Sequence, residues 1–242
     1  MSKQIQESVL DATYEPEFVV FRDRVDAGVR LAQALRQYHG KEVLVLGIPR
    51  GGVIVAAEVA RQLDAELDVL VARKLGAPFE PELAIGAVTA NGGRFLNPDI
   101  VSELGISEAY LEEVTTQQMA EARRREARLR GVRPAARVTG RIVLLVDDGL
   151  ATGATMRAAV RSVKSQKPAR VVVAVPVGSP HACEALRQES DEVVCLFEPA
   201  FFFAIGAFYE HFEPTQDDEI QRLLQETPSP ATTGGAAPSV RS

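Results

Sequence analysis

The chain has 242 residues, 46% of them hydrophobic and 25% charged, and its 27 Lys and Arg against 33 Asp and Glu give a net charge of −6. This composition is typical of a globular protein with a sizeable core, and the acidic balance argues against nucleic acid as a partner. The N-terminus lacks the apolar core of a signal peptide and no apolar run could cross a bilayer, so we expect a cytoplasmic protein without membrane contact. Cys183 and Cys195 have neither metal-ligand nor redox-motif spacing, which predicts reduced, structural thiols.

The first part of the chain predicts a helix followed by a pair of parallel strands. Apolar residues recur at helical spacing and then in short unbroken runs, with a small-residue helix between two of these runs. Two strands joined by a helix of this length form a βαβ unit, and hence a parallel sheet. The predicted elements are a helix over 23–35, a strand over 43–46, a helix over 53–63 and a strand over 67–72 that ends in Arg73 and Lys74.

The pattern changes after Lys74. An Asn-Gly-Gly turn at 91–93 separates two strand-like runs, 84–89 and 94–96, which predicts a hairpin. Ser107 is then suited to cap a helix that reaches residue 130. Glutamates gather at the start of that helix and arginines at its end, an order that the helix dipole alone partly explains. The arginines are Arg123, Arg124, Arg125, Arg128 and Arg130.

The stretch 142–156 has the features of an anion site. Five apolar residues predict a buried strand, which ends in Asp147 and Asp148; a small-residue turn and a helix from about residue 154 follow. The N–H groups of such a turn converge where the helix dipole also favours negative charge, and Thr152 and Thr155 add hydroxyl donors. Two carboxylates repel a phosphate, so we expect them to bind sugar hydroxyls or a hydrated Mg²⁺ beside it.

The remaining elements complete a doubly wound α/β fold with a mainly parallel sheet. Strands are predicted over 170–175 and 193–196 and a helix over 179–189. The aromatic stretch 197–212 either forms a hood over an acceptor base or packs against the core or a second subunit, and packing is the commoner fate of any one aromatic. We expect one domain over 1–225, with a helical insertion at about 91–137 and a C-terminal hood at about 197–215, and a disordered tail over 226–242.

The run V-D-D-G-L-A-T-G-A-T at 146–155 resembles the phosphoribosyl-diphosphate (PRPP) binding motif of the type I phosphoribosyltransferases. The resemblance extends over about 18–215, where the chain is similar to the uncharacterised phosphoribosyltransferase group of this family. It implies that Asp147 and Asp148 hold the ribose hydroxyls, with Mg²⁺ bound there directly or through water. It also implies that the ribose 5-phosphate is held by the loop residues Ala151, Thr152, Gly153, Ala154 and Thr155.

A second stretch, G-I-P-R-G-G at 47–52, also follows a predicted parallel strand, at the edge where open α/β sheets bind ligands. It resembles the pyrophosphate loop of the same family, and the basic pair after the next strand resembles the family's Arg-Lys pair. The residues that the resemblance assigns to pyrophosphate are Pro49, Arg50, Gly51, Gly52, Arg73 and Lys74, with Arg50 and Lys74 as charge-neutralising catalytic residues beside the two aspartates.

The sequence departs from the family in one respect. Several members place basic residues in a mobile loop after the Arg-Lys pair, yet 75–93 contains neither Lys nor Arg. Either Arg94 or the arginine-rich helix end supplies that charge, or the chemistry is slow. Ala151 stands where hypoxanthine–guanine enzymes carry an aspartate, which argues against a 6-oxopurine acceptor by the standard mechanism.

The sequence thus predicts an Mg²⁺-dependent phosphoribosyltransferase, a pentosyltransferase that joins PRPP to a nucleobase-like acceptor and releases pyrophosphate. The alternative is a PRPP-sensing regulator that keeps the pocket and has lost the chemistry, as the missing basic loop would suggest. A subunit with a purely structural role leaves the acidic pair unexplained. A homodimer is the usual assembly of the family and is expected here.

Overall fold

The computed structural model describes residues 21–227 and contains two sheets. The larger one has five parallel strands in the order β2-β1-β6-β7-β8. Short β-branched runs form its middle strands because both of their faces are buried, as is usual for parallel sheets. The strands are β1 (Val43–Gly47), β2 (Glu66–Val69), β6 (Ile142–Val146), β7 (Arg170–Val177) and β8 (Glu192–Phe197).

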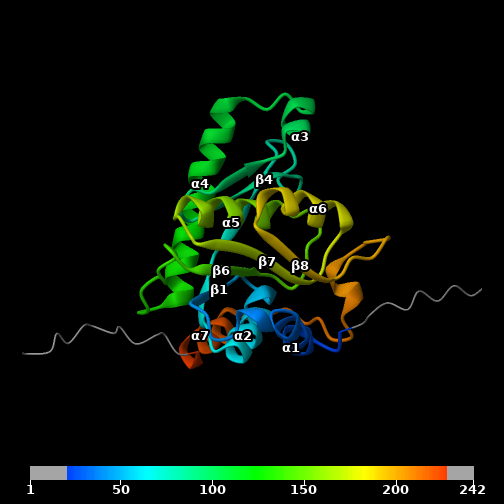
Figure 1. The fold of residues 1–242 in the computed structure, drawn as a ribbon. Coiled ribbons are helices and arrows are strands. Elements are labelled where there is room, and N and C mark those ends of the chain that lie inside the picture. The colour runs from blue at the N-terminus through cyan, green and yellow to red at the C-terminus, as the bar shows by residue number, and fades with distance from the viewer. Residues whose placement is uncertain (1–20, 228–242) are drawn as a thin grey trace, which may run out of the picture.

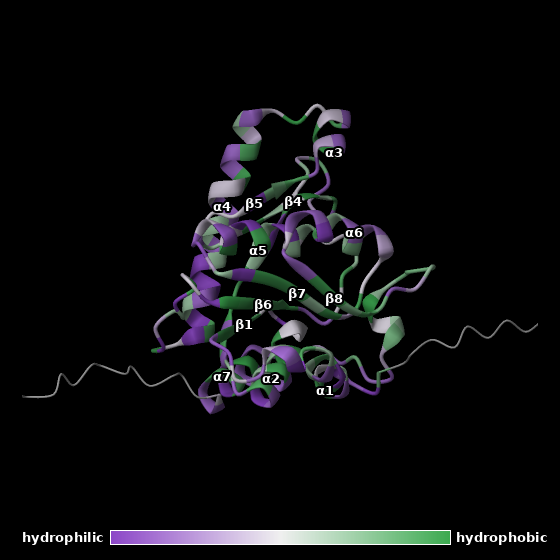
Figure 2. Ribbon diagram, viewed as in Figure 1, coloured by the Kyte–Doolittle hydropathy of each residue, from purple (hydrophilic) through white to green (hydrophobic). Residues whose placement is uncertain are grey.

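Helices cover both faces of this sheet (Figure 1). Along β6, Leu144 and Val146 pack in one core cluster with the helices of one face, while Val143 and Leu145 pack in a second cluster with those of the other. This alternation makes the middle strands of the sheet mostly apolar, as their green colour in Figure 2 shows. One face carries α1 (Arg24–Ala34), α2 (Gly51–Leu63) and α7 (Asp217–Glu226), and the other carries α5 (Ala154–Ser165) and α6 (Pro180–Glu189).

The small antiparallel sheet lies against α5, between that helix and the long helix α4 (Figure 1). One of its faces packs on α4 through Leu75 and Val88, and the other packs on α5 through Ala87 and Phe95. Its strands are β3 (Ala72–Gly76), β4 (Ala84–Thr89) and β5 (Arg94–Leu96), followed by α3 (Pro98–Glu103) and α4 (Glu108–Arg130). Two short 3₁₀ helices, η1 (Arg36–Tyr38) and η2 (Ile205–Phe208), complete the elements of residues 21–227.

Most of the predicted elements are confirmed, including the parallel sheet, the 84–96 hairpin and the Ser107 cap of α4. The single strand predicted over 67–72 is wrong: β2 ends at Val69, and β3 begins at Ala72 in the other sheet. Leu70 and Val71 are buried like the strand residues before them, so an unbroken apolar run hides the change of sheet. Arg73 and Lys74 therefore lie inside β3 and do not close a strand of the parallel sheet.

Two helices were not predicted, α3 and α7. Helix α7 has apolar residues at Ile220, Leu223 and Leu224 and three acidic residues in its first turn, a pattern that a closer reading of periodicity identifies. It extends to Glu226, the first residue of the predicted tail, and most of that tail lies outside the described residues. None of the helices within 21–227 has the length and apolar character required to span a bilayer.

Candidate functional site

Two loops meet at the carboxyl edge of the parallel sheet. The glycine loop (residues 48–52) follows β1, and the acidic loop (residues 147–155) follows β6, the strand beside it. Gly47 pairs with Val146 at the ends of these strands, so both loops leave the sheet at the same level. This is the edge at which open α/β sheets bind ligands.

The two loops are in direct contact, and glycine permits that contact. A Cβ on Gly52 would lie 2.6 Å from Oδ1 and 2.7 Å from Cα of Asp147 and 3.0 Å from the carbonyl oxygen of Val146. A Cβ on Gly51 would overlap Oδ2 of Asp148 and Nε of Arg24. The glycine loop therefore requires its glycines because the carboxylates occupy the space of a side chain.

Asp148 is held by groups that are distant in sequence. Its Oδ2 accepts a 2.7 Å hydrogen bond from Nε of Arg24, and both side chains are about nine-tenths buried, at 12% and 10% exposed. Nη1 of the same arginine donates to the carbonyl oxygen of Glu213 at 2.9 Å, and its guanidinium lies 3.8 Å from the centre of the Phe212 ring. The hydroxyl of Tyr209 donates to the carbonyl oxygen of Asp148 at 2.6 Å. Asp148 is therefore an ion-paired, fixed carboxylate.

Asp147 differs, because no cationic side chain of residues 21–227 forms an ion pair with it. Its Oδ1 accepts the N–H of Asp148 at 2.8 Å. Burial, and then the neighbouring charge of Asp148, raise the pKa of the Asp147 carboxyl well above its usual range. An unpaired carboxylate of this kind is one that a ligand cation or a set of hydroxyl donors would stabilise.

The far end of the acidic loop leads into α5. Gly153 has a φ of +74°, and it caps α5 without a side-chain hydrogen bond, so the first N–H groups of the helix remain available to a ligand. Ala151 and Thr152 are exposed, and Thr155 is half-buried beside them. Oγ of Ser179 donates to the carbonyl oxygen of Ala151 at 2.6 Å, which fixes the loop from α6. The loop thus combines N–H and hydroxyl donors for an anion.

The structure separates the predicted basic pair. Arg73 shares a face of β3 with Leu75, which packs on α4, and its Nε donates to Oε1 of Gln118 on that helix at 3.1 Å. Lys74 is exposed and pairs with Ala87, which packs on Ala154 and Ala158 of α5. Lys74 thus lies on the side of the acidic loop, and Arg73 does not.

The remaining glycine-loop residues, Pro49 and Arg50, lie just before α2. Pro49 is half-buried, and the peptide bond between it and Arg50 is cis. Arg50 is exposed at the N-terminus of α2, where the dipole also favours an anion.

The aromatic stretch closes the other side of the site. Ile205 packs on Gly149, where a Cβ would lie 2.7 Å from Cγ2 of the isoleucine. Five of its aromatics pack together with Phe21, while Phe201 and Phe203 are exposed at 72% and 85%. Most of this stretch is therefore core, as expected for aromatics, and these two rings are free for other contacts. The packed rings are Phe197, Phe202, Phe208, Tyr209 and Phe212.

Sequence reasoning missed Arg24 and Tyr209, the two side chains that fix Asp148. Arg24 lies one residue after Asp23, the N-cap of α1, and in the sequence it looks like an ordinary surface arginine. The buried site for it exists only because Asp148 and residues 212–213 meet it there. No local signal could have identified this contact.

Two of the arginines that were candidates for the missing basic loop have partners elsewhere in the fold. Arg123 donates to the carbonyl oxygen of Ala90 at 2.8 Å, and Arg130 is paired with Asp68 and Glu126. Alternate residues of a strand share a face, so Arg94 lies on the same side of the small sheet as Leu96, which packs on the α4 side.

The two cysteines, separate in sequence, come together in the fold. Sγ of Cys183, Sγ of Cys195 and a carboxylate oxygen of Glu198 all lie within 4.8 Å of one another, and both thiols are free. The free thiols agree with the expected reduced state, while the sequence spacing gave no sign that they would be neighbours.

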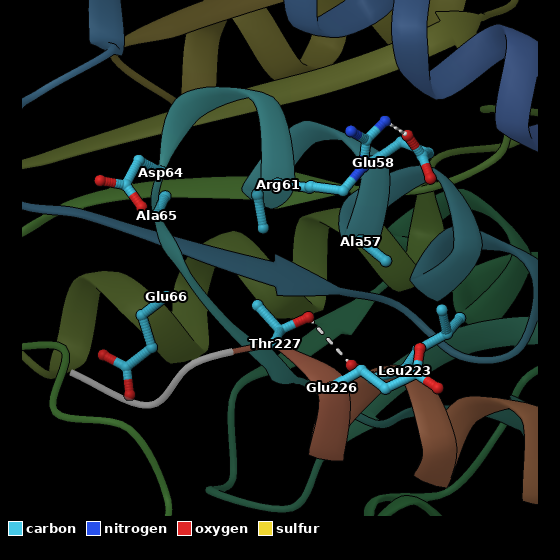
Figure 3. A pocket seen from close by; sticks show the side chains of 10 residues that line it. Ala57, Glu58, Arg61, Asp64, Ala65, Glu66, Leu223, Glu226 and Thr227 are labelled. Carbon is cyan, nitrogen blue, oxygen red and sulfur yellow. Dashed lines mark hydrogen bonds and ion pairs between the residues drawn. The ribbon is translucent and has the colours of Figure 1, made fainter. Parts of the chain in front are cut away.

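A hollow of about 520 Å³ lies between α2 and α7, but it does not coincide with the loops (Figure 3). Asp64 follows the last turn of α2 and Glu66 begins β2, so this hollow is at the amino edge of the sheet. Ligands of parallel sheets bind at the opposite edge, which is why we assign the site to the loops.

Comparison with known proteins identifies relatives of the chain. A family profile described as "Phosphoribosyl transferase domain" matches residues 23–209. Two Mycobacterium tuberculosis proteins, from strains CDC 1551 and H37Rv, carry provisional phosphoribosyl transferase names; each is 49% identical over 205 residues, which is 85% of this chain and 46% of the relative. This chain thus spans less than half the length of these relatives. The crystal structure of TT1426 from Thermus thermophilus has a TM-score of 0.74 at 48% identity, covering 87% of this chain and 100% of that one.

Proposed function

The chain belongs to the phosphoribosyltransferase family, and we propose that it transfers the 5-phosphoribosyl group of PRPP to a nucleobase-like acceptor, with release of pyrophosphate. The observation that carries the proposal is the contact between the glycine loop and the two aspartates. It puts a glycine-rich anion loop, an acidic pair and a helix N-terminus at one sheet edge, which matches the phosphate, diol and diphosphate of PRPP.

In this proposal the acidic loop holds the ribose 5-phosphate. The N–H groups at the start of α5 and the hydroxyls of Thr152 and Thr155 donate to the phosphate oxygens. Ala151 stands where hypoxanthine–guanine enzymes carry an aspartate, which argues against a 6-oxopurine acceptor by the standard mechanism. The two aspartates are expected to accept hydrogen bonds from the ribose hydroxyls, Asp147 directly and Asp148 through the oxygen that Arg24 leaves free.

The carboxylate of Asp147, half-buried and without an ion-pair partner in the described chain, also suits Mg²⁺, because hard divalent cations prefer carboxylate oxygens and retain several waters. Asp147 would hold it, together with Asp148 directly or through water. When bound, the ion would neutralise charge on the diphosphate.

The chain itself contributes positioning and charge. Arg50 and Lys74 are proposed to neutralise the charge that develops on the pyrophosphate, while the two loops keep the ribose fixed as the bond at C1 breaks ahead of attack by the acceptor nitrogen. Arg73 is left out of this set because it faces α4. We assign no general base.

The experiment is a calorimetric titration of PRPP into the protein with and without Mg²⁺, followed by assay of pyrophosphate release with a panel of nucleobases. We expect Mg²⁺-dependent binding that Asp147→Asn removes. Asp147 is the better target because Asp148→Asn would also disturb the Arg24 ion pair. A matched control is Asp99→Asn, an exposed aspartate at the start of α3. If Asp147→Asn bound PRPP as the wild type does, the assignment would be wrong.

A second candidate is a PRPP-sensing protein without transferase activity. Two observations favour it: residues 75–93 contain no basic side chain, and Arg123 and Arg130 are engaged elsewhere. It predicts Mg²⁺-dependent PRPP binding with no pyrophosphate release for any acceptor. Release with one acceptor excludes it.

A further inference from the structure

A second cationic site lies on the α4 side of the small sheet. A hollow of about 320 Å³ is lined by Arg73 of β3 and by Glu121, Arg124, Arg125 and Arg128 of α4; we refer to it as the arginine pocket. It is separate from the loop site, because Arg73 and Lys74 point to opposite faces of β3.

The pocket has more positive than negative charge. Two carboxylates neutralise its four guanidinium groups in part: Glu121 pairs with Arg124, and Asp217 of α7 pairs with both Arg125 and Arg128. Arg73 uses its Nε on the neutral amide oxygen of Gln118. Two positive charges therefore remain in excess.

A buried donor points to a ligand independently. Nε of Arg125 is buried and has no hydrogen-bond acceptor in the part of the chain that the structure describes. A buried N–H without a partner costs about 1–3 kcal/mol, and such groups in native proteins commonly bind a water or an ion. Helix stability does not explain the pocket either. The dipole accounts for arginines late in α4, but not for Arg73, which comes from a strand.

We propose that the arginine pocket binds a small phosphate-bearing anion of the size of pyrophosphate. Guanidinium groups bind phosphate oxygens through paired, charge-assisted hydrogen bonds, and three arginines within about one turn of α4 line this hollow together with Arg73 from β3. An extended polyanion such as RNA fits less well, because Glu121 and Asp217 lie among the arginines and the whole chain carries a net charge of −6.

The test is a titration of inorganic pyrophosphate into the protein without Mg²⁺. Binding is monitored by calorimetry and by the NMR resonance of the Nε–H group of Arg125. We expect this resonance to shift on saturation. Arg124→Gln with Arg128→Gln should weaken the binding about tenfold or more, because charge-assisted hydrogen bonds are lost. Both side chains are more than half exposed, so this double variant should fold.

The matched control is Arg61→Gln with Arg222→Gln, which removes the same charge from two exposed helix faces. Equal loss of affinity in the control would reduce the proposal to a general charge effect and overturn it. Pyrophosphate affinity that persists in Arg50→Gln with Lys74→Gln, two exposed residues of the loop site, supports a site distinct from the loops, whether or not the chain proves to be a transferase. The proposal is overturned if pyrophosphate leaves the Arg125 resonance unshifted. It is also overturned if a single-stranded oligonucleotide shifts that resonance and pyrophosphate does not.

Discussion

The loop site and the arginine pocket both gather charge at the surface of the fold, yet they are built differently. At the loops, the Arg24–Asp148 ion pair is buried and held by contacts from distant parts of the chain, and glycines fill the space beside it. In the arginine pocket, Arg124 and Arg128 are 69% and 65% exposed and come from one helix. The first arrangement is sensitive to the loss or gain of a few atoms, whereas the second can lose a side chain with little structural effect. Stability measurements on single variants test this contrast.

The largest effect is expected from Arg24→Met. The substitution keeps an apolar stem and leaves Asp148 as a buried carboxylate without its partner, which should lower the free energy of unfolding by about 4 kcal/mol. Urea denaturation followed by circular dichroism measures it. Arg30→Met, six residues on in the same helix at an exposed ion pair, should cost less than about 0.5 kcal/mol. Equal losses for the two variants would contradict the contrast.

Gly52→Ala should follow, at about 3 kcal/mol, because the new Cβ meets backbone atoms of Val146 and Asp147 that cannot move aside. It should also remove PRPP binding. Gly105→Ala provides the control: the space around Gly105 is open and its φ is +58° at the end of α3, so only left-handed backbone strain of about 1 kcal/mol is expected. Thermal unfolding and PRPP calorimetry are measured on both variants. If Gly52→Ala were as stable as the wild type, the two loops would not be tightly packed.

Asp147→Asn should stabilise the protein while removing PRPP binding. Since the folded state raises the pKa of this carboxyl, the folded protein binds its proton more tightly than the unfolded chain does, and stability is lost as pH rises through the folded pKa. Asparagine cannot ionise, so the variant should be more stable by about 1 kcal/mol at neutral pH, and this difference should vanish below about pH 4. Denaturation at several pH values measures the difference. A variant less stable than the wild type at pH 7 is the contrary result.

The smallest effect is expected in the arginine pocket. Arg124 forms its ion pair with Glu121 at an exposed helix position, so Arg124→Gln should change the free energy of unfolding by less than about 0.5 kcal/mol. Thermal unfolding at low and high salt gives the value. If the free energy of unfolding fell by more than about 2 kcal/mol, the pocket would be required for the stability of the fold.

Local patterns predicted the frame of the site. The apolar run of β6, the two acids after it and the small-residue turn into α5 are consecutive in sequence, and their conformations follow from neighbouring residues. The partners of the acids could not be predicted in the same way. Arg24 and Asp148 are 124 residues apart, and periodicity carries no information about such a contact.

The error at residues 67–72 has a similar cause. An apolar run reports burial, and Leu70 and Val71 are buried although the chain there passes from one sheet to the other. Once β3 is known to start at Ala72, simple alternation puts Arg73 on the face of Leu75 and Lys74 on the opposite one. The side of the sheet was thus predictable from the sequence, but the start of the strand was not.

The hydrogen bonds of Arg24 also have a consequence for the order in which parts of the chain fold. This one side chain joins Asp148 and the carbonyl oxygen of Glu213, which lie 124 and 189 residues further along the chain. During synthesis α1 emerges first, and it must wait for nearly the whole chain before its arginine gains both partners. The acidic pair therefore acquires its final geometry only after the aromatic stretch has docked, so a nascent or C-terminally shortened chain that lacks residues 209–213 has the loops without the contacts that fix Asp148.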